Sequence, residues 1–159
     1  MGLFKETFME SDDFNTPQAS FDTVPADAIL LEQDDPTIIL TVEVCVKHPH
    51  NTTIKLDSMI ELFVQFSEDL SEKIFVVSYE LLKNDVPIRR MLPETEFGVA
   101  GQLVIHKSFP NLTFIDSSPA SGTNTYQIRL ERESEFEVDV NQIAVLSGAL
   151  NATVIQNQS

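Results

Sequence analysis

The sequence predicts an all-β protein, an antiparallel jelly-roll β-sandwich with an extended N-terminal connector. Apolar and polar residues alternate along several short runs, turn-forming residues separate these runs, and no long segment keeps a helical period. The chain has 159 residues, of which 42% are hydrophobic, so it is long enough to bury one substantial core. We place the connector at residues 1–36 and the jelly-roll sandwich at residues 37–159.

The connector is set apart by its composition. Residues 1–36 mix acidic residues, Ser, Thr and isolated Phe without a sustained period, and their prolines argue against a long helix. The composition changes after Pro36, where runs rich in Val, Ile, Leu and Thr begin.

The sandwich is expected to contain eight or nine strands, because period-two alternation recurs along it. In residues 37–46, for example, alternate residues from Ile38 to Val46 are apolar and share one face. The sequence KNDVP is expected to turn the chain between two strands, and FIDSSPASGTN to form a loop. The expected strands cover residues 37–46, 52–67, 73–82, 86–92, 99–106, 112–116, 124–131, 135–140 and 141–156.

The chain is strongly acidic, with a net charge of −15. Residues 1–36 hold nine acidic residues against Lys5 alone, a net charge of −8, and the remaining residues contribute −7. An acidic surface repels nucleic-acid phosphates and anionic lipids, so we expect neither nucleic acid nor a membrane as a partner. The sequence contains no run of about 18 apolar residues, the length that would be needed to span a bilayer.

The sequence carries no signature of catalysis, so we do not expect an enzyme or a cofactor. It has no nucleophile elbow, no glycine-rich phosphate loop and no calcium-loop spacing. The only metal-like motif is HPH, with His48 and His50, which resembles the paired histidines of cupins. A cupin needs a carboxylate four or five residues further on, whereas the nearest acidic residue is Asp57. We therefore expect a solvated turn and no metal, although His106 is a conceivable third ligand.

Cys45 is the only cysteine, so no internal disulfide can form. Its place in an alternating run predicts a buried thiol, and an intermolecular disulfide within an assembly is the alternative. The N-terminal sequence shows no secretory signal, because Glu6 and Glu10 interrupt its only apolar stretch.

Four phenylalanines, Phe4, Phe8, Phe14 and Phe21, stand out in the acidic connector. Ordering a backbone costs about 1–2 kcal/mol per residue, and burying four Phe side chains returns roughly 6–12 kcal/mol. This gain can order about ten residues, so the rest must gain main-chain hydrogen bonds along a sheet edge. We predict that the four rings anchor the connector in a groove of a neighbouring copy.

Four stretches of the sandwich carry a family resemblance: IKLDSMIELFVQFS, KIFVVSYELLKNDVPI, TFIDSSPASGTNTYQIRLE and NQIAVLSGALNATVIQ. In order and pattern they resemble the spore-surface jelly-roll proteins of bacilli, which include endospore appendage and exosporium subunits with a fold similar to tumour necrosis factor and C1q. The resemblance implies jelly rolls that form trimers, N-terminal connectors that join subunits into fibres, and a place on the spore exterior after lysis of the mother cell. Two departures are the absence of cysteine from the connector and of a collagen-like repeat.

The expected function is therefore that of a structural subunit of a self-assembling extracellular fibre, whose partner is the protein itself in a head-to-tail arrangement. The alternative is a jelly-roll head module of a phage or spore-surface fibre that binds a receptor or a glycan. The first predicts filaments, whereas the second predicts a finite oligomer.

Overall fold

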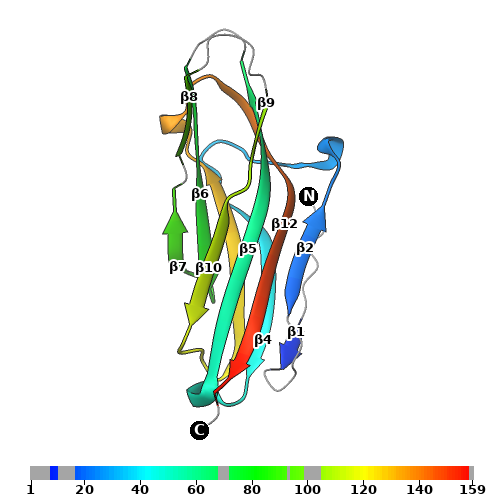
Figure 1. Ribbon diagram of the computed structural model, residues 1–159, viewed down its shortest axis with the longest axis vertical. Helices are drawn as coiled ribbons and strands as arrows, with labels where there is room; N and C mark the ends of the chain where they lie inside the picture. The colour runs from blue at the N-terminus through cyan, green and yellow to red at the C-terminus, as the bar shows by residue number, and fades with distance from the viewer. Residues whose placement is uncertain (1–7, 11–16, 68–71, 93, 99–104, 158–159) are drawn as a thin grey trace.

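The computed structural model describes residues 8–10, 17–67, 72–92, 94–98 and 105–157. These residues form two β-sheets packed face to face, with short 3₁₀ turns between some strands and no α-helix within the described ranges (Figure 1). The 3₁₀ turns are Pro25–Asp27, Pro49–Asn51 and Ser134–Phe136.

Each sheet is built around long strands with shorter strands at its edges. The first sheet has the order β1 (Phe8–Glu10), β4 (Thr37–Val46), β11 (Gly122–Arg132), β6 (Glu72–Lys83) and β7 (Val86–Met91), with β8 (Glu94–Gly98) also on β6. The second sheet has the order β10 (Asn111–Asp116), β5 (Thr52–Phe66), β12 (Val140–Gln156) and β2 (Gln18–Asp22), with β3 (Ile29–Leu30) on β12 and β9 (Ile105–Ser108) on β5.

The strand order identifies a jelly roll. Four strands, β4-β11-β6-β7, face another four, β10-β5-β12-β2, and every pair among these eight is antiparallel. β4 and β5 follow each other in the sequence but lie in opposite sheets, and so do β5 and β6. The chain therefore crosses from one layer to the other, as it does in a jelly roll. The predicted fold class is thus confirmed.

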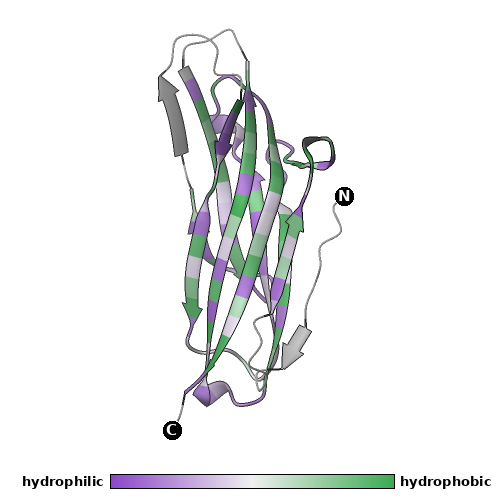
Figure 2. Ribbon diagram, turned by 45° about the vertical axis from the view of Figure 1, so that its right-hand side comes forward, coloured by the Kyte–Doolittle hydropathy of each residue, from purple (hydrophilic) through white to green (hydrophobic). Residues whose placement is uncertain are grey.

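The core is made by the buried side chains of both sheets. Hydrophobic and hydrophilic residues alternate along many of the strands (Figure 2). Along β5 every second side chain from Thr52 to Phe66 is buried, and the polar Ser58 takes one of these inward positions. Two tyrosines, Tyr79 and Tyr126, are the largest fully buried residues. The alternation that predicted the strands therefore also lines the core.

Two local predictions are wrong. In β4, Leu40 pairs with Ile128 while Ile38 pairs with Arg129, so Ile39 is the extra residue of a bulge. The bulge turns Ile39 into the core and leaves Ile38 exposed. Residues 135–140 were expected to be a strand, but residues 135–139 form the end of a 3₁₀ turn and an irregular link with a single bridge at Val138, and Val140 is already the first residue of β12.

The sandwich begins earlier than residue 37, because the first jelly-roll strand, β2, lies inside the predicted connector. β2 pairs with Ser147–Asn151 of β12, and β3 pairs with Ala144–Val145 (Figure 1). Ala19 of β2 is fully buried and Leu31, just after β3, is 2% exposed. Residues 17–31 thus cover the outer edge of β12 in their own chain, and the segment before the sandwich is residues 1–16.

Both core tyrosines are hydrogen-bonded at their hydroxyl groups. The hydroxyls of Ser58 and Tyr79 are bonded to each other, and the Tyr126 hydroxyl donates to Asp116 Oδ2 at 2.6 Å. Burial raises the pKa of Tyr79 to about 12, against an opposing effect of the bond to Ser58. Burial and the Asp116 carboxylate together raise the pKa of Tyr126. Neither phenol ionises near neutral pH in the folded protein.

Alkaline pH is expected to destabilise the fold through these tyrosines. Because the folded pKa of Tyr79 is raised, its stabilising contribution is complete below the unfolded pKa near 10 and is lost as the pH rises through about 12. Tyr79 alone accounts for roughly 2–3 kcal/mol of unfolding free energy over that range. Urea denaturation at a series of pH values above 9 measures the loss, and Tyr79→Phe should flatten it. A free energy that stays level through about pH 11 would contradict the buried phenols.

Candidate interaction surface

The outer edge of β4 receives a piece of the N-terminal segment. β1 lies parallel to β4 with Phe8 beside Glu43, Met9 beside Val44 and Glu10 beside Cys45. The other side of β4 is fully engaged with β11. Among the described residues, no strand pairs with Thr37–Val42 on the β1 side, so this part of the β4 edge is an unpaired sheet edge there.

Cys45 lies on this edge with a free thiol. Its neighbours Val44 and Val46 point into the core, so Cys45 is on the outer face of the sheet, between Glu10 of β1 and Thr123 of β11. The residue is half-buried, whereas the sequence predicted a buried thiol. An intermolecular disulfide through Cys45 stays a prediction.

The four phenylalanine anchors have different outcomes. Phe4 and Phe14 lie outside the described residues, and Phe8 is the first residue of β1. Phe21 is partly buried against the core of its own chain, opposite Gly148 of β12. A β-carbon at Gly148 would lie 3.1 Å from Phe21 Cε1, so the glycine makes room for the ring. In contrast to its predicted role, Phe21 therefore stabilises its own sandwich.

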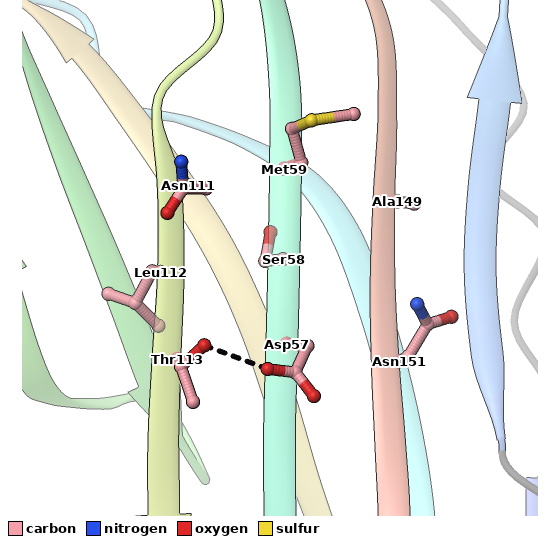
Figure 3. A pocket seen from close by; sticks show the side chains of 8 residues that line it. All are labelled: Asp57, Ser58, Met59, Asn111, Leu112, Thr113, Ala149 and Asn151. Carbon is pink, nitrogen blue, oxygen red and sulfur yellow. Dashed lines mark hydrogen bonds between the residues drawn. The ribbon is translucent and has the colours of Figure 1, made fainter.

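A hollow lies on the outer face of the second sheet, where β10, β5 and β12 run side by side (Figure 3). Its volume is about 310 Å³, and it is lined by Asp57, Ser58, Met59, Asn111, Leu112, Thr113, Ala149 and Asn151. Strand register brings these residues together, because Asn111 and Ala149 both pair with Met59, and Thr113 and Asn151 both pair with Asp57.

The hollow combines hydrogen-bonding groups with an apolar surface. The Thr113 hydroxyl donates to Asp57 Oδ1 at 2.8 Å, and Lys55 Nζ lies 3.0 Å from Asp57 Oδ2. The bonds from Thr113 and Lys55 lower the pKa of Asp57, so it is a carboxylate at neutral pH. Met59 is 53% exposed on the outward side of β5. A methionine among mainly polar residues on the outward side of β5 is the sequence signal that could have indicated this surface.

The histidines do not form a cluster. His48 and His50 flank Pro49 in the turn between β4 and β5, and both are exposed. His106 pairs with Val64 near the other end of β5. The rise per residue of a strand puts it roughly 40 Å from the two histidines of the turn. Burial lowers the pKa of His106, whose ring centroid lies 5.9 Å from that of Phe75. Within the described ranges, no three His, Cys, Asp or Glu side chains are arranged to hold a metal ion.

No helix in the described parts of the chain has the length and apolar character needed to cross a membrane.

No protein-family model matches the chain, and no curated protein matches it. Solved structures with some similarity include the insecticidal delta-endotoxin Cry8Ea1 from Bacillus thuringiensis, at 9% identity and a TM-score of 0.40 over 82% of this chain. The structure of the Gx strain of infectious bursal disease virus matches at 12% identity and a TM-score of 0.41 over 89% of this chain. The alignments cover only 20% and 32% of those two chains. The jelly-roll assignment rests on the strand order described above.

Proposed function

We propose that this protein is a structural subunit of a self-assembling extracellular fibre, in which the N-terminal segment of one copy adds a strand to the β4 edge of the next. The observation that carries the proposal is the parallel pairing of β1 with Glu43–Cys45. This pairing supports the proposal that the β4 edge receives the N-terminal peptide of this protein in a defined register. The resemblance to spore-surface jelly rolls adds the setting: a spore exterior, with jelly rolls grouped in trimers.

Exchange of β1 between copies needs no new contact. The same hydrogen bonds form whether β1 comes from its own chain or from a neighbour, so the exchanged form differs mainly in the entropy of association. A contact that leaves one copy and enters the next is head-to-tail and grows into a filament where it does not close into a ring. The connector in this proposal is residues 1–16, with Phe4, Phe8 and Phe14 as its apolar anchors.

Electrostatics sets a condition for assembly. Each copy has a net charge of −15, and β1 reaches β4 beside Glu43. Repulsion between copies opposes the exchange, and salt screens it over a distance of about 8–10 Å at moderate ionic strength. Elongation should therefore be faster in high salt.

A designed disulfide distinguishes exchange between copies from pairing within one chain. Neighbouring strands lie about 4.8 Å apart, within the Cα separation of about 4.4–6.8 Å that a disulfide needs. Glu10→Cys places a second thiol beside Cys45, and mild oxidation should then give a ladder of covalent oligomers on a non-reducing gel. Met9→Cys is the matched control, because its partner is Val44 and its side of the sheet is opposite. Fibres made only of internally cross-linked single chains would overturn the proposal.

Removing the connector tests its need directly. Deletion of residues 2–16 is expected to leave a folded protein that no longer elongates, as seen by electron microscopy and size-exclusion chromatography. The deletion must end before Pro17, whose carbonyl accepts a hydrogen bond from Ala152 at the start of the β2–β12 pairing. Fibres of normal length from the truncated protein would refute the role of the connector.

A second candidate function, a glycan- or receptor-binding head, is favoured by the hollow on the second sheet. Amide and carboxylate groups beside an apolar side chain are the groups that bind hydroxylated ligands. This function predicts a finite oligomer. It also predicts binding to a glycan array, and the Asp57→Ala substitution should weaken that binding. Asp22→Ala, an exposed carboxylate on β2 outside the hollow, is the matched control.

A further inference from the structure

Lys73 and Asp139 form a buried pair at the end of the sandwich where β6 begins. Lys73 Nζ lies 2.7 Å from Asp139 Oδ2, and their side chains are only 1% and 4% exposed. Lys73 is near the start of β6, and Asp139 immediately precedes β12, 66 residues further along the chain.

The pair is held rigidly by backbone hydrogen bonds from three segments. Lys73 Nζ also donates to the carbonyl of Ser67 at 2.8 Å, and the Ser67 N–H donates to the carbonyl of Asp139 at 2.9 Å. Next to them, Ile74 and Val138 exchange two backbone hydrogen bonds. These hydrogen bonds fix the backbone beside both the amine and the carboxyl group.

Two phenylalanine rings lie close to the pair. Lys73 Nζ lies 5.8 Å from the centroid of the Phe66 ring, and the Phe66 and Phe75 ring centroids are 6.1 Å apart. Both phenylalanines are at most 1% exposed. Taking two opposite charges out of water costs several kcal/mol per ion, a cost that a neutral amide does not carry.

We propose that Lys73 and Asp139 condense into an intramolecular isopeptide bond. A proton passes from Nζ to Oδ2 along their contact, and the neutral amine then attacks the Asp139 carboxyl carbon, Cγ. The Nζ–Cγ bond forms, the Cγ–Oδ2 bond breaks, and Oδ2 leaves as water with two protons that came from Nζ. The step has no redox change and needs no co-reactant.

The product fits the site without rearrangement. Of the three protons on the ammonium group, one remains on the amide nitrogen, where it can keep the hydrogen bond to the Ser67 carbonyl. Fixed contact between two reacting groups is equivalent to effective concentrations of about 10⁵–10⁸ M, which favours a reaction that is negligible between free side chains. The water molecule that leaves is released to bulk solvent, which favours the condensed product.

Two other buried pairs show why the inference is specific to this one. Arg132 and Glu137 are similarly buried, at 7% and 6% exposure, but a guanidinium is always charged and does not attack a carboxyl group. Lys83 is 18% exposed at its contact with Asp116. Burial acts to raise the pKa of Asp116, but hydrogen bonds from Lys83, Tyr126 and Ser118 keep it below its ordinary value, so this carboxyl group stays an unreactive anion.

Intact-mass spectrometry of the purified full chain tests the proposal. The protein is expected to be lighter than its sequence by one water molecule, and trypsin should fail to cleave after Lys73. Tandem mass spectrometry should find the peptides that contain Lys73 and Asp139 joined. Lys73→Arg keeps the ion pair but cannot condense, so it should show the full mass, and Lys83→Arg should retain the deficit.

Asp139→Ala provides a second variant that removes the carboxyl group without touching Lys73, and it should also show the full mass. A wild-type chain that keeps its full mass after prolonged incubation, with Lys73 open to trypsin, would show that the pair is only ionic. A mass deficit that survives in Lys73→Arg would place the lost water elsewhere and would equally overturn the assignment.

Discussion

Replacing Phe21 with alanine is expected to lower the free energy of unfolding by about 2–3 kcal/mol. The ring is partly buried between β2 and the core, over Gly148, so its loss leaves a cavity beside Leu40 and Ile60. The expected loss is below the roughly 3–5 kcal/mol of a fully buried phenylalanine, because part of the ring is exposed. Urea denaturation followed by circular dichroism measures it.

The matched control is Phe109→Ala, because Phe109 is 54% exposed and should change the stability by at most about 0.5 kcal/mol. The effect of Phe21→Ala should be the same at all protein concentrations, since the ring packs within its own chain. A loss that disappears on dilution would instead seat Phe21 in a neighbouring copy, as the sequence alone predicted.

Asp116→Ala is expected to have the largest effect, a loss of about 3–5 kcal/mol of unfolding free energy. Asp116 accepts hydrogen bonds from Lys83 Nζ and from the buried Tyr126 hydroxyl. Its removal leaves a largely buried ammonium group and a buried hydroxyl without their shared acceptor. Urea denaturation at neutral pH, with the transition checked for two-state behaviour, gives the value.

The pH dependence of the wild type gives a second measure of Asp116. Because its folded pKa is lowered, its stabilising contribution is present above the unfolded pKa of about 4 and is lost as the pH falls through the folded value. The Asp116→Ala variant should lack this part of the acid-dependent loss. Asp57→Ala is the control, since its ion pair with Lys55 is exposed and such pairs contribute about 0–1 kcal/mol. Equal losses in the two variants would contradict the buried network.

The long strands could be predicted from the sequence because each alternates over many residues, although bulges interrupt the alternation in β4 and β12. β4 and β12 are found where the sequence placed them, except that β12 begins one residue earlier, and β5 ends one residue before its predicted end. β2 was missed because only Ala19 and Phe21 of its five residues face inward, which is too short an alternation to stand out. Its stability comes from its partner β12, which no local pattern reveals.

The opposite error occurred at residues 135–140, where alternation was present without a strand. Glu137 there binds Arg132, five residues earlier, through two hydrogen bonds at 2.6 and 2.8 Å, a local contact that holds the chain in another path. The candidate sites were hidden for a different reason. The hollow and the Lys73–Asp139 pair each bring together residues from distant strands, so they exist only once strand order and register are fixed.

The pairing of β2 with β12 has a consequence for biosynthesis. β2 is the first strand of the jelly roll to be synthesised, and β12, which ends at Gln156, is the last. Among the described residues β12 is the only sheet neighbour of β2, so β2 cannot pair until β12 has been made. A nascent chain therefore cannot complete its second sheet while the final strand is still in the exit tunnel, and non-local closure of this kind is slow. Closure of the second sheet is thereby deferred until β12 has left the ribosome.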